Sequence, residues 1–98
     1  MMRSAKRAAR LLPAAEGLQP EMFPTRERRA RLHTDLARAW WQRGRPEETT
    51  HALLAAMSEA PTEVRGRPAI RAIAEELVDR HRLVPGVREL AGALGPRR

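Results

Sequence analysis

Apolar residues recur along this chain at the spacing of amphipathic helices, and no segment alternates apolar and polar residues with a period of two. The clearest stripe follows Pro68 and consists of Ile70, Ile73, Ala74, Leu77 and Val78. Prolines and glycines divide the chain into helical segments expected at residues 3–12, 26–43, 46–60, 68–82 and 87–94. The pattern therefore predicts an all-helical protein of about five helices.

The second and third segments carry the signals of a helical hairpin. Thr25 is placed to cap the helix that begins at residue 26. Gly44 and Arg45 provide the turn, and Pro46 occupies the first position of the next helix, where its missing N–H costs nothing. We therefore expect residues 26–60 to form two antiparallel helices.

The apolar stripes of this hairpin predict which of its side chains are buried. The first helix is expected to bury Leu32, Leu36, Ala37 and Trp40, and the second to bury Thr49, Ala52, Leu53, Ala56, Met57 and Ala60. If Trp40 fills the core, its replacement by Ala should cost about 3–5 kcal/mol of stability.

The hairpin resembles a tetratricopeptide repeat. The matching positions are Leu36, Ala37, Trp40, Gly44, Leu53, Ala56 and Pro61, with Thr49 in a slot where that repeat has Ala. Residues 3–13 resemble the second half of a preceding repeat. The resemblance implies antiparallel hairpins stacked as a short right-handed solenoid, a scaffold that binds partners. We expect one domain over residues 1–98, consisting of a half-repeat helix and loop (1–25), a repeat hairpin (26–61) and closing helices (62–95).

A second resemblance covers about two-thirds of the chain, from Arg29 to Gly95. The residues that carry it are 36–39, 44–45, 52–56, 60–65, 67–68, 87–91 and 94–95. In order and spacing they are similar to the C-terminal region of actinobacterial helix-turn-helix transcription regulators of the XRE type. That resemblance implies a sensing or oligomerisation domain that follows a DNA-reading domain. The DNA-reading domain is absent from this sequence, so we expect a truncated regulator that does not bind specific DNA directly.

Composition narrows the function further. The chain has 98 residues, no Cys and only 3% aromatic residues, so thiolate metal sites and Cys nucleophiles are excluded. No apolar run approaches the roughly 18 residues that a membrane span needs, so a cytoplasmic location without membrane contact is expected. The net charge of +7 comes from nineteen basic residues, eighteen of them Arg. This preference for Arg over Lys is typical of proteins encoded by a GC-rich genome.

One basic cluster has a helical pattern. Arg3, Lys6, Arg7 and Arg10 share one face of the first predicted helix, and Ala5, Ala8 and Leu12 lie on the other. The basic face is either an ordinary solvated surface or a patch for a polyanion or an acidic partner.

The sequence offers little for catalysis. Its three histidines lie on three different predicted helices: His33, His51 and His81. None has a second His at the spacing of a paired metal motif. Glu75, Glu76 and Asp79 lie on the polar side of their helix, where Arg71, Arg80 and Arg82 can pair with them. We expect no enzymatic activity, no metal and no cofactor.

Trp40 and Trp41 cannot face the same neighbour, because adjacent residues on a helix point about 100° apart. Resemblance to tetratricopeptide repeats places Arg31, Thr34, Arg38, Trp41 and Gln42 along a concave binding surface. Trp41 can instead pack against a neighbouring helix. The sequence thus favours a non-enzymatic interaction or sensing module that binds a protein, a peptide, a small effector or a second copy through this groove. The alternative is a small Arg-rich protein that binds DNA or RNA non-specifically.

Overall fold

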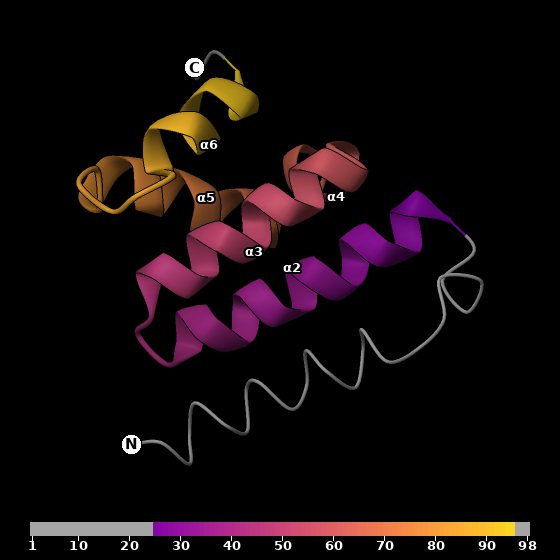
Figure 1. The fold of residues 1–98 in the computed structure, drawn as a ribbon, viewed down its shortest axis with the longest axis horizontal. Helices are drawn as coiled ribbons and strands as arrows, with labels where there is room; N and C mark the ends of the chain where they lie inside the picture. The colour runs from indigo at the N-terminus through magenta and orange to yellow at the C-terminus, as the bar shows by residue number, and fades with distance from the viewer. Residues whose placement is uncertain (1–24, 96–98) are drawn as a thin grey trace.

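The computed structural model describes residues 25–95, which form helices without any strand (Figure 1). The helices are α2 (Arg26–Gln42), α3 (Pro46–Glu59), α4 (Thr62–Arg65), α5 (Pro68–Arg80) and α6 (Val87–Leu94). The predicted all-helical class is confirmed for this part of the chain. The helix expected at residues 3–12 lies outside the described residues.

Helices α2 and α3 form the expected antiparallel hairpin (Figure 1). The Thr25 hydroxyl accepts a hydrogen bond from the Arg28 amide at 3.1 Å and so caps the start of α2. At the turn, the amides of Gly44 and Arg45 donate to the last carbonyls of α2. Gly44 has a φ of 71°, a left-handed backbone conformation that residues other than Gly rarely adopt. Pro46 begins α3, as predicted.

Helices α2 and α3 each end one residue before the predicted end, and two larger differences follow Pro61 and Arg80. Pro61 ends α3 but also starts the unpredicted short helix α4, since its backbone is helical and its carbonyl accepts the amides of Val64 and Arg65. Helix α5 ends at Arg80, two residues before the predicted end. A proline interrupts the hydrogen bonds of the turn before it but leaves the following turn free to form, which explains why one residue both stops and starts a helix.

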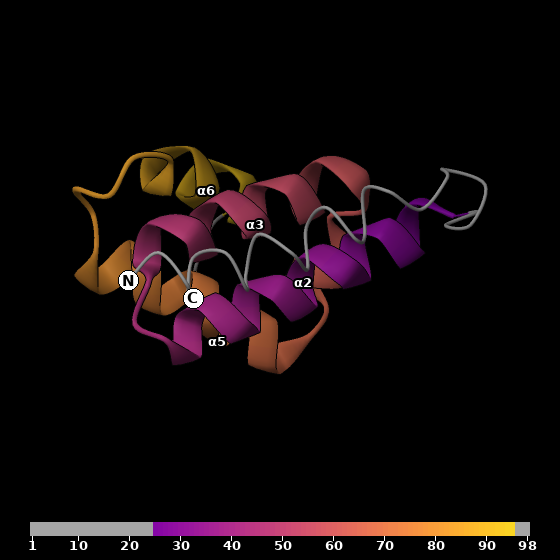
Figure 2. The same cartoon turned by 60° about the horizontal axis from the view of Figure 1, so that its bottom comes forward.

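Helix α3 is the centre of this arrangement and contacts the other four described helices. In both views α6 lies on the side of α3 away from α2 (Figures 1 and 2). The largest fully buried side chains come from four helices and are Leu53, Val64, Ile70, Leu77 and Leu90. The predicted stripe of α5 is confirmed, because Ile70, Ala74 and Leu77 are buried and their neighbours Ile73 and Val78 pack against the core.

The stripe predicted for α2 is partly wrong. Leu36 and Ala37 are buried as predicted, but Leu32 and Trp40 are only half-buried and do not belong to the core. Ala30 is fully buried instead, and Trp41 packs against the core. The inward face of α2 is therefore the one that carries small residues. Helices α4 and α5 pack against α2, and small residues allow this close approach.

Candidate binding groove

An open groove of about 640 Å³ lies along the α2–α3 hairpin. Helix α2 contributes His33, Leu36 and Trp40, whose spacing of three and four residues places them on one face. Helix α3 contributes Glu47, Glu48, His51, Ala52 and Ala55, and Pro85 completes the described lining. We call this surface the Trp40 groove.

The groove is apolar along its length and acidic at one end. Because the hairpin is antiparallel, Trp40 lies near the first turn of α3, where Glu47 and Glu48 are found, and His33 lies toward Ala55 at the other end. Leu36 lies between them and is 8% exposed. An occupant would therefore meet aliphatic and aromatic carbon in the middle and two carboxylates beside the turn.

Trp40 is held by a cation at the acidic end. The Arg45 guanidinium lies 5.5 Å from the centroid of the Trp40 ring, within the range of a cation–π interaction. The same guanidinium forms an ion pair with Glu48. These contacts join the turn to the first turn of α3 and fix the indole at the groove surface.

The loop between α5 and α6 brings Pro85 to the groove. Gly86, which follows it, has a φ of 92°. A Cβ atom at Gly86 would meet Leu54 Cδ1 at 3.0 Å and Thr50 Cγ2 at 3.2 Å. The loop therefore lies so close to α3 that only Gly fits there without strain.

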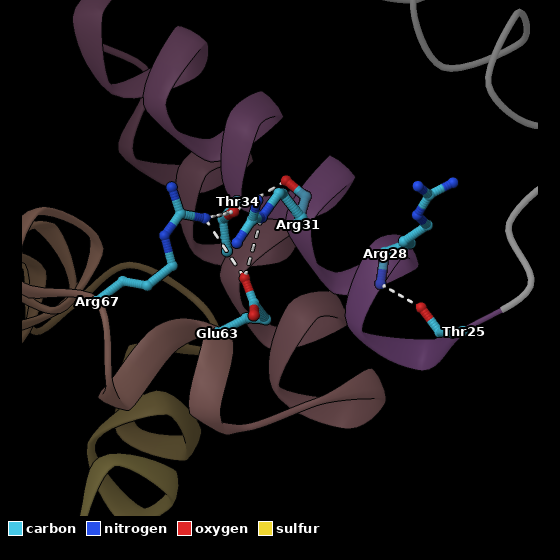
Figure 3. A network of polar contacts seen from close by, with 6 residues as sticks. All are labelled: Thr25, Arg28, Arg31, Thr34, Glu63 and Arg67. Atoms are coloured by element: carbon cyan, nitrogen blue, oxygen red, sulfur yellow. Dashed lines mark hydrogen bonds and ion pairs between the residues drawn. The ribbon is translucent and has the colours of Figure 1, made fainter.

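The residues predicted for a concave surface divide into two groups. Thr34 is fully buried; its hydroxyl donates to the Arg31 carbonyl at 2.9 Å and accepts from Arg67 Nη1 at 2.8 Å. Arg31 and Arg67 both form ion pairs with the Glu63 carboxylate, at 3.5 and 3.6 Å (Figure 3). This network joins α2 to α4 and to the start of α5, so two of the predicted residues serve the packing of helices.

Trp41 also contributes to the packing. It is half-buried against the core, and its ring meets the His81 ring edge-on with centroids 6.0 Å apart. Arg38 and Gln42 are exposed. The five predicted residues thus do not line one groove, and their binding to a partner stays a prediction.

The charge of the described part is nearly balanced. Residues 25–95 contain thirteen Arg and ten acidic residues, a net charge of +3 of the total +7. Several of these Arg side chains form ion pairs, including Arg71 with Glu75 and Arg80 with Glu76, both at 2.9 Å and both predicted. The basic face of Arg3, Lys6, Arg7 and Arg10 lies outside the described residues.

The buried polar side chains of the described helices are used in local contacts. No group of three or more His, Asp or Glu residues in this part could hold a metal ion. Every buried polar side chain described has a hydrogen-bond partner. None of these helices has the length and apolar character that crossing a membrane requires.

Comparison with known proteins identifies no relative. No protein-family model matches the chain, and neither curated proteins nor solved structures give a significant match. The class that the described residues define is an all-helical domain with an open groove on its first hairpin.

Sequence reasoning missed the Trp40 groove, although the signal was present. His33, Leu36 and Trp40 have helical spacing, and so do Glu48, His51, Ala52 and Ala55 on α3. The stripe on α3 is rich in Ala, and alanines at helical spacing are equally typical of a buried core face. The sequence pattern alone therefore does not distinguish the groove from the core.

Proposed function

We propose that this chain is a non-catalytic interaction module that binds an amphipathic helix of a protein partner in the Trp40 groove. The observation that carries the proposal is a half-buried Trp, held in place at the surface, within a long apolar groove. Trp is among the side chains that contribute most to binding when a partner covers them.

The form of the groove favours a helix over a small effector. Ala52 and Ala55 lie one turn apart on α3, and small residues let a second backbone approach closely. Leu36 and Trp40 lie one turn apart on α2 and form the opposite wall. Apolar residues one turn apart on both sides of the groove are compatible with the i, i+3, i+4, i+7 anchors of a docked helix.

The acidic end indicates the charge of that helix. Glu47 is exposed and has no ion pair within the described residues, and Glu48 pairs only with Arg45. A Lys or Arg near one end of the partner helix would complement these carboxylates and fix its direction.

The two family resemblances of the sequence suggest what surrounds this module and where it acts. A hairpin of the tetratricopeptide type would receive the second helix of a preceding repeat on such a face, and α5 and α6 would form a following repeat of the short solenoid. Resemblance to regulators of the XRE type suggests a cytoplasmic role in transcription regulation, with a protein, a peptide or a second copy as partner. The balanced charge of residues 25–95 gives no support to non-specific nucleic-acid binding.

The proposal is tested by selecting helical peptides from a display library against the full chain. We expect the selected peptides to share an apolar stripe and a basic residue toward one end. Ala55→Glu, which places a charge in the groove, should weaken their binding at least about tenfold. Ala39→Glu is the matched control, because Ala39 is exposed on α2 outside the groove. Binding that resists Ala55→Glu, or that both variants reduce equally, overturns the proposal.

A further inference from the structure

The groove face of the α2–α3 hairpin continues beyond the groove to an ion pair. Arg29 lies four residues before His33, so it belongs to the same helix face as the groove residues of α2. Glu59 lies four residues after Ala55 and extends the groove face of α3 in the same way. The Arg29 guanidinium pairs with the Glu59 carboxylate at 3.1 Å, so the two extensions meet at the end far from the turn.

The two ends of this face carry opposite charges. At the far end Arg26 pairs with the same Glu59 carboxylate at 3.5 Å, so two guanidinium groups share one carboxylate. At the turn end the described lining of the groove includes Glu47 and Glu48 but no Arg or Lys. The face is therefore basic at one end and acidic at the other.

A face with this pattern is complementary to itself when two copies meet in an antiparallel direction. Arg29 and Trp40 are eleven residues apart, about 16 Å along α2, and a two-fold rotation exchanges the two ends. An axis beside Leu36, which lies between them, brings Arg29 of each copy to Glu47 of the other. The same axis places Trp40 of each copy opposite His33 of the other, so the exposed part of the indole is covered.

The small residues of α3 allow the two hairpins to approach closely. Because Arg29 pairs with Glu59, the residues seven positions closer to the turn on each helix, Leu36 and Ala52, lie at the same level. The two-fold axis therefore passes beside Ala52 of both copies, where the small side chains let the two backbones come near each other. The product is an antiparallel four-helix bundle, in which α2 packs on α2 and α3 packs on α3.

A parallel arrangement of the two copies would bring like charges together. The four carboxylates of Glu47 and Glu48 would then lie at one end of the bundle. The four guanidinium groups of Arg26 and Arg29 would lie at the other end. Like charges placed opposite each other weaken an interface, so charge selects the antiparallel form.

We propose that the Trp40 groove accepts a second copy of this chain, antiparallel and related by a two-fold axis, with Arg29 of each copy beside Glu47 of the other. The inference rests on the proposed function, because it takes α2 of the second copy as the amphipathic helix that covers the groove. It adds the identity of the partner, since α2 has an apolar groove face with a basic residue at its beginning. Each copy thus supplies the cation that the acidic end of the other groove requires.

Sedimentation velocity of the full chain at micromolar concentration and low salt tests the dimer directly. We expect the sedimentation coefficient of a dimer, and a shift toward the monomer as the salt concentration rises, because salt screens the charge pairs at the ends. A monomer throughout the micromolar range overturns the proposal, whether its groove is open or is covered by another part of the same chain.

Charge reversal tests the direction of the two copies. Glu47→Lys and Arg29→Glu should each weaken the dimer about tenfold, because each places like charges together twice in every dimer. An equal mixture of the two variants should restore the affinity of the parent chain, since every contact between them then joins opposite charges. The mixture also shows that both variants are folded. A mixture that dimerises no better than either variant alone overturns the proposal.

Matched controls separate the interface from general effects of charge. Glu89→Lys makes the same change at an exposed residue in the first turn of α6, which lies on the side of α3 away from α2 (Figures 1 and 2). Arg28→Glu makes the other change on α2, at an exposed position about 100° around the helix from Arg29. Both controls should dimerise as the parent chain does. If they weaken the dimer as much as the groove variants, the proposal is overturned.

A single engineered cysteine locates the two-fold axis without interference, because the chain has no Cys. Ala52→Cys places the thiols of two copies beside the axis, so mild oxidation should give a disulfide-linked dimer. Ala39→Cys, on an exposed face of α2, should stay reduced under the same conditions. Linkage of Ala39→Cys at the rate of Ala52→Cys overturns the antiparallel register.

The two proposals fail separately. Arg29→Glu leaves both groove carboxylates in place, so this variant should bind selected peptides more tightly than the parent chain, whose groove the second copy covers. A dimer that passes the charge tests, without peptide binding to this variant, overturns the binding of a separate partner helix alone. Peptide binding that depends on Ala55, to a chain that stays monomeric, overturns only the second copy as the occupant.

Discussion

Trp40 and Trp41 are adjacent on α2 but lie on two different faces of the helix, which have different neighbours. Trp41 packs against the core and the His81 ring, on the face that also buries Ala30, Thr34 and Ala37. Trp40 lies on the groove face, where its ring contacts the guanidinium of Arg45. The first face is closed by α4 and α5, and the second has an open surface.

The difference shows that burial on a helix follows the neighbouring helices more closely than it follows the size of its side chains. The face of α2 that packs against α4 and α5 buries small and polar residues beside Trp41, and the buried Thr34 hydroxyl accepts a hydrogen bond from Arg67, which pairs with Glu63. The groove face has two large apolar residues, Leu36 and Trp40. Leu36 is itself 8% exposed and Trp40 is half-buried, so Trp40 is the larger apolar side chain that a partner could still cover on this face.

The largest expected effect separates the two tryptophans. Trp41→Ala should cost about 2–4 kcal/mol of unfolding free energy, because it leaves a gap beside the core. Trp40→Ala should cost about 1 kcal/mol or less, which replaces the larger cost expected from the sequence. Urea denaturation followed by circular dichroism measures both. Equal costs, or a larger cost for Trp40→Ala, would contradict the contrast between the faces.

The next largest effect is expected from loss of the buried hydrogen bonds of Thr34, on the face of α2 that packs against α4 and α5. Thr34→Val keeps the shape of the side chain but removes the oxygen that accepts from Arg67 and donates to the Arg31 carbonyl. We expect a loss of about 1–2 kcal/mol, since a buried hydrogen bond is broken. Thr34→Ser, which keeps the hydroxyl, is the control and should be more stable than Thr34→Val by denaturant midpoint. If the two variants are equally stable, the hydrogen bonds of the Thr34 hydroxyl in Figure 3 contribute nothing to stability.

The smallest effect concerns the contact between Arg45 and the Trp40 ring on the groove face. Arg45→Ala removes the cation over the Trp40 ring and the ion pair with Glu48, and should cost about 0.5–1 kcal/mol. The difference should decrease at high salt, because exposed charges are screened. Arg43→Ala, on an exposed neighbour in the same turn, should change the denaturant midpoint little. Identical midpoints for the two variants at low salt would show that Arg45 does not hold Trp40 in solution.

Much of the local structure could be predicted from the sequence. Thr25 caps α2, Gly44 makes the turn, and Pro46 and Pro68 begin their helices as expected. The ion pairs of α5 also follow from spacing, since residues four apart on a helix are neighbours. The groove was harder to predict than the local structure. The spacing of Leu36 and Trp40 predicts that they share a face, but it does not indicate whether another helix covers that face.

By itself, then, the sequence determined where the four longer described helices begin and which residues share a face, because capping, turn conformation and the helical period depend on neighbours along the chain. The tertiary structure decided which face is inside. Thr34 is buried because Arg67, thirty-three residues away, supplies its hydrogen bond, and Trp40 stays at the surface because α4 and α5 pack against a different face of α2. Contacts between distant residues are set by the packing of whole helices, and no local pattern records them.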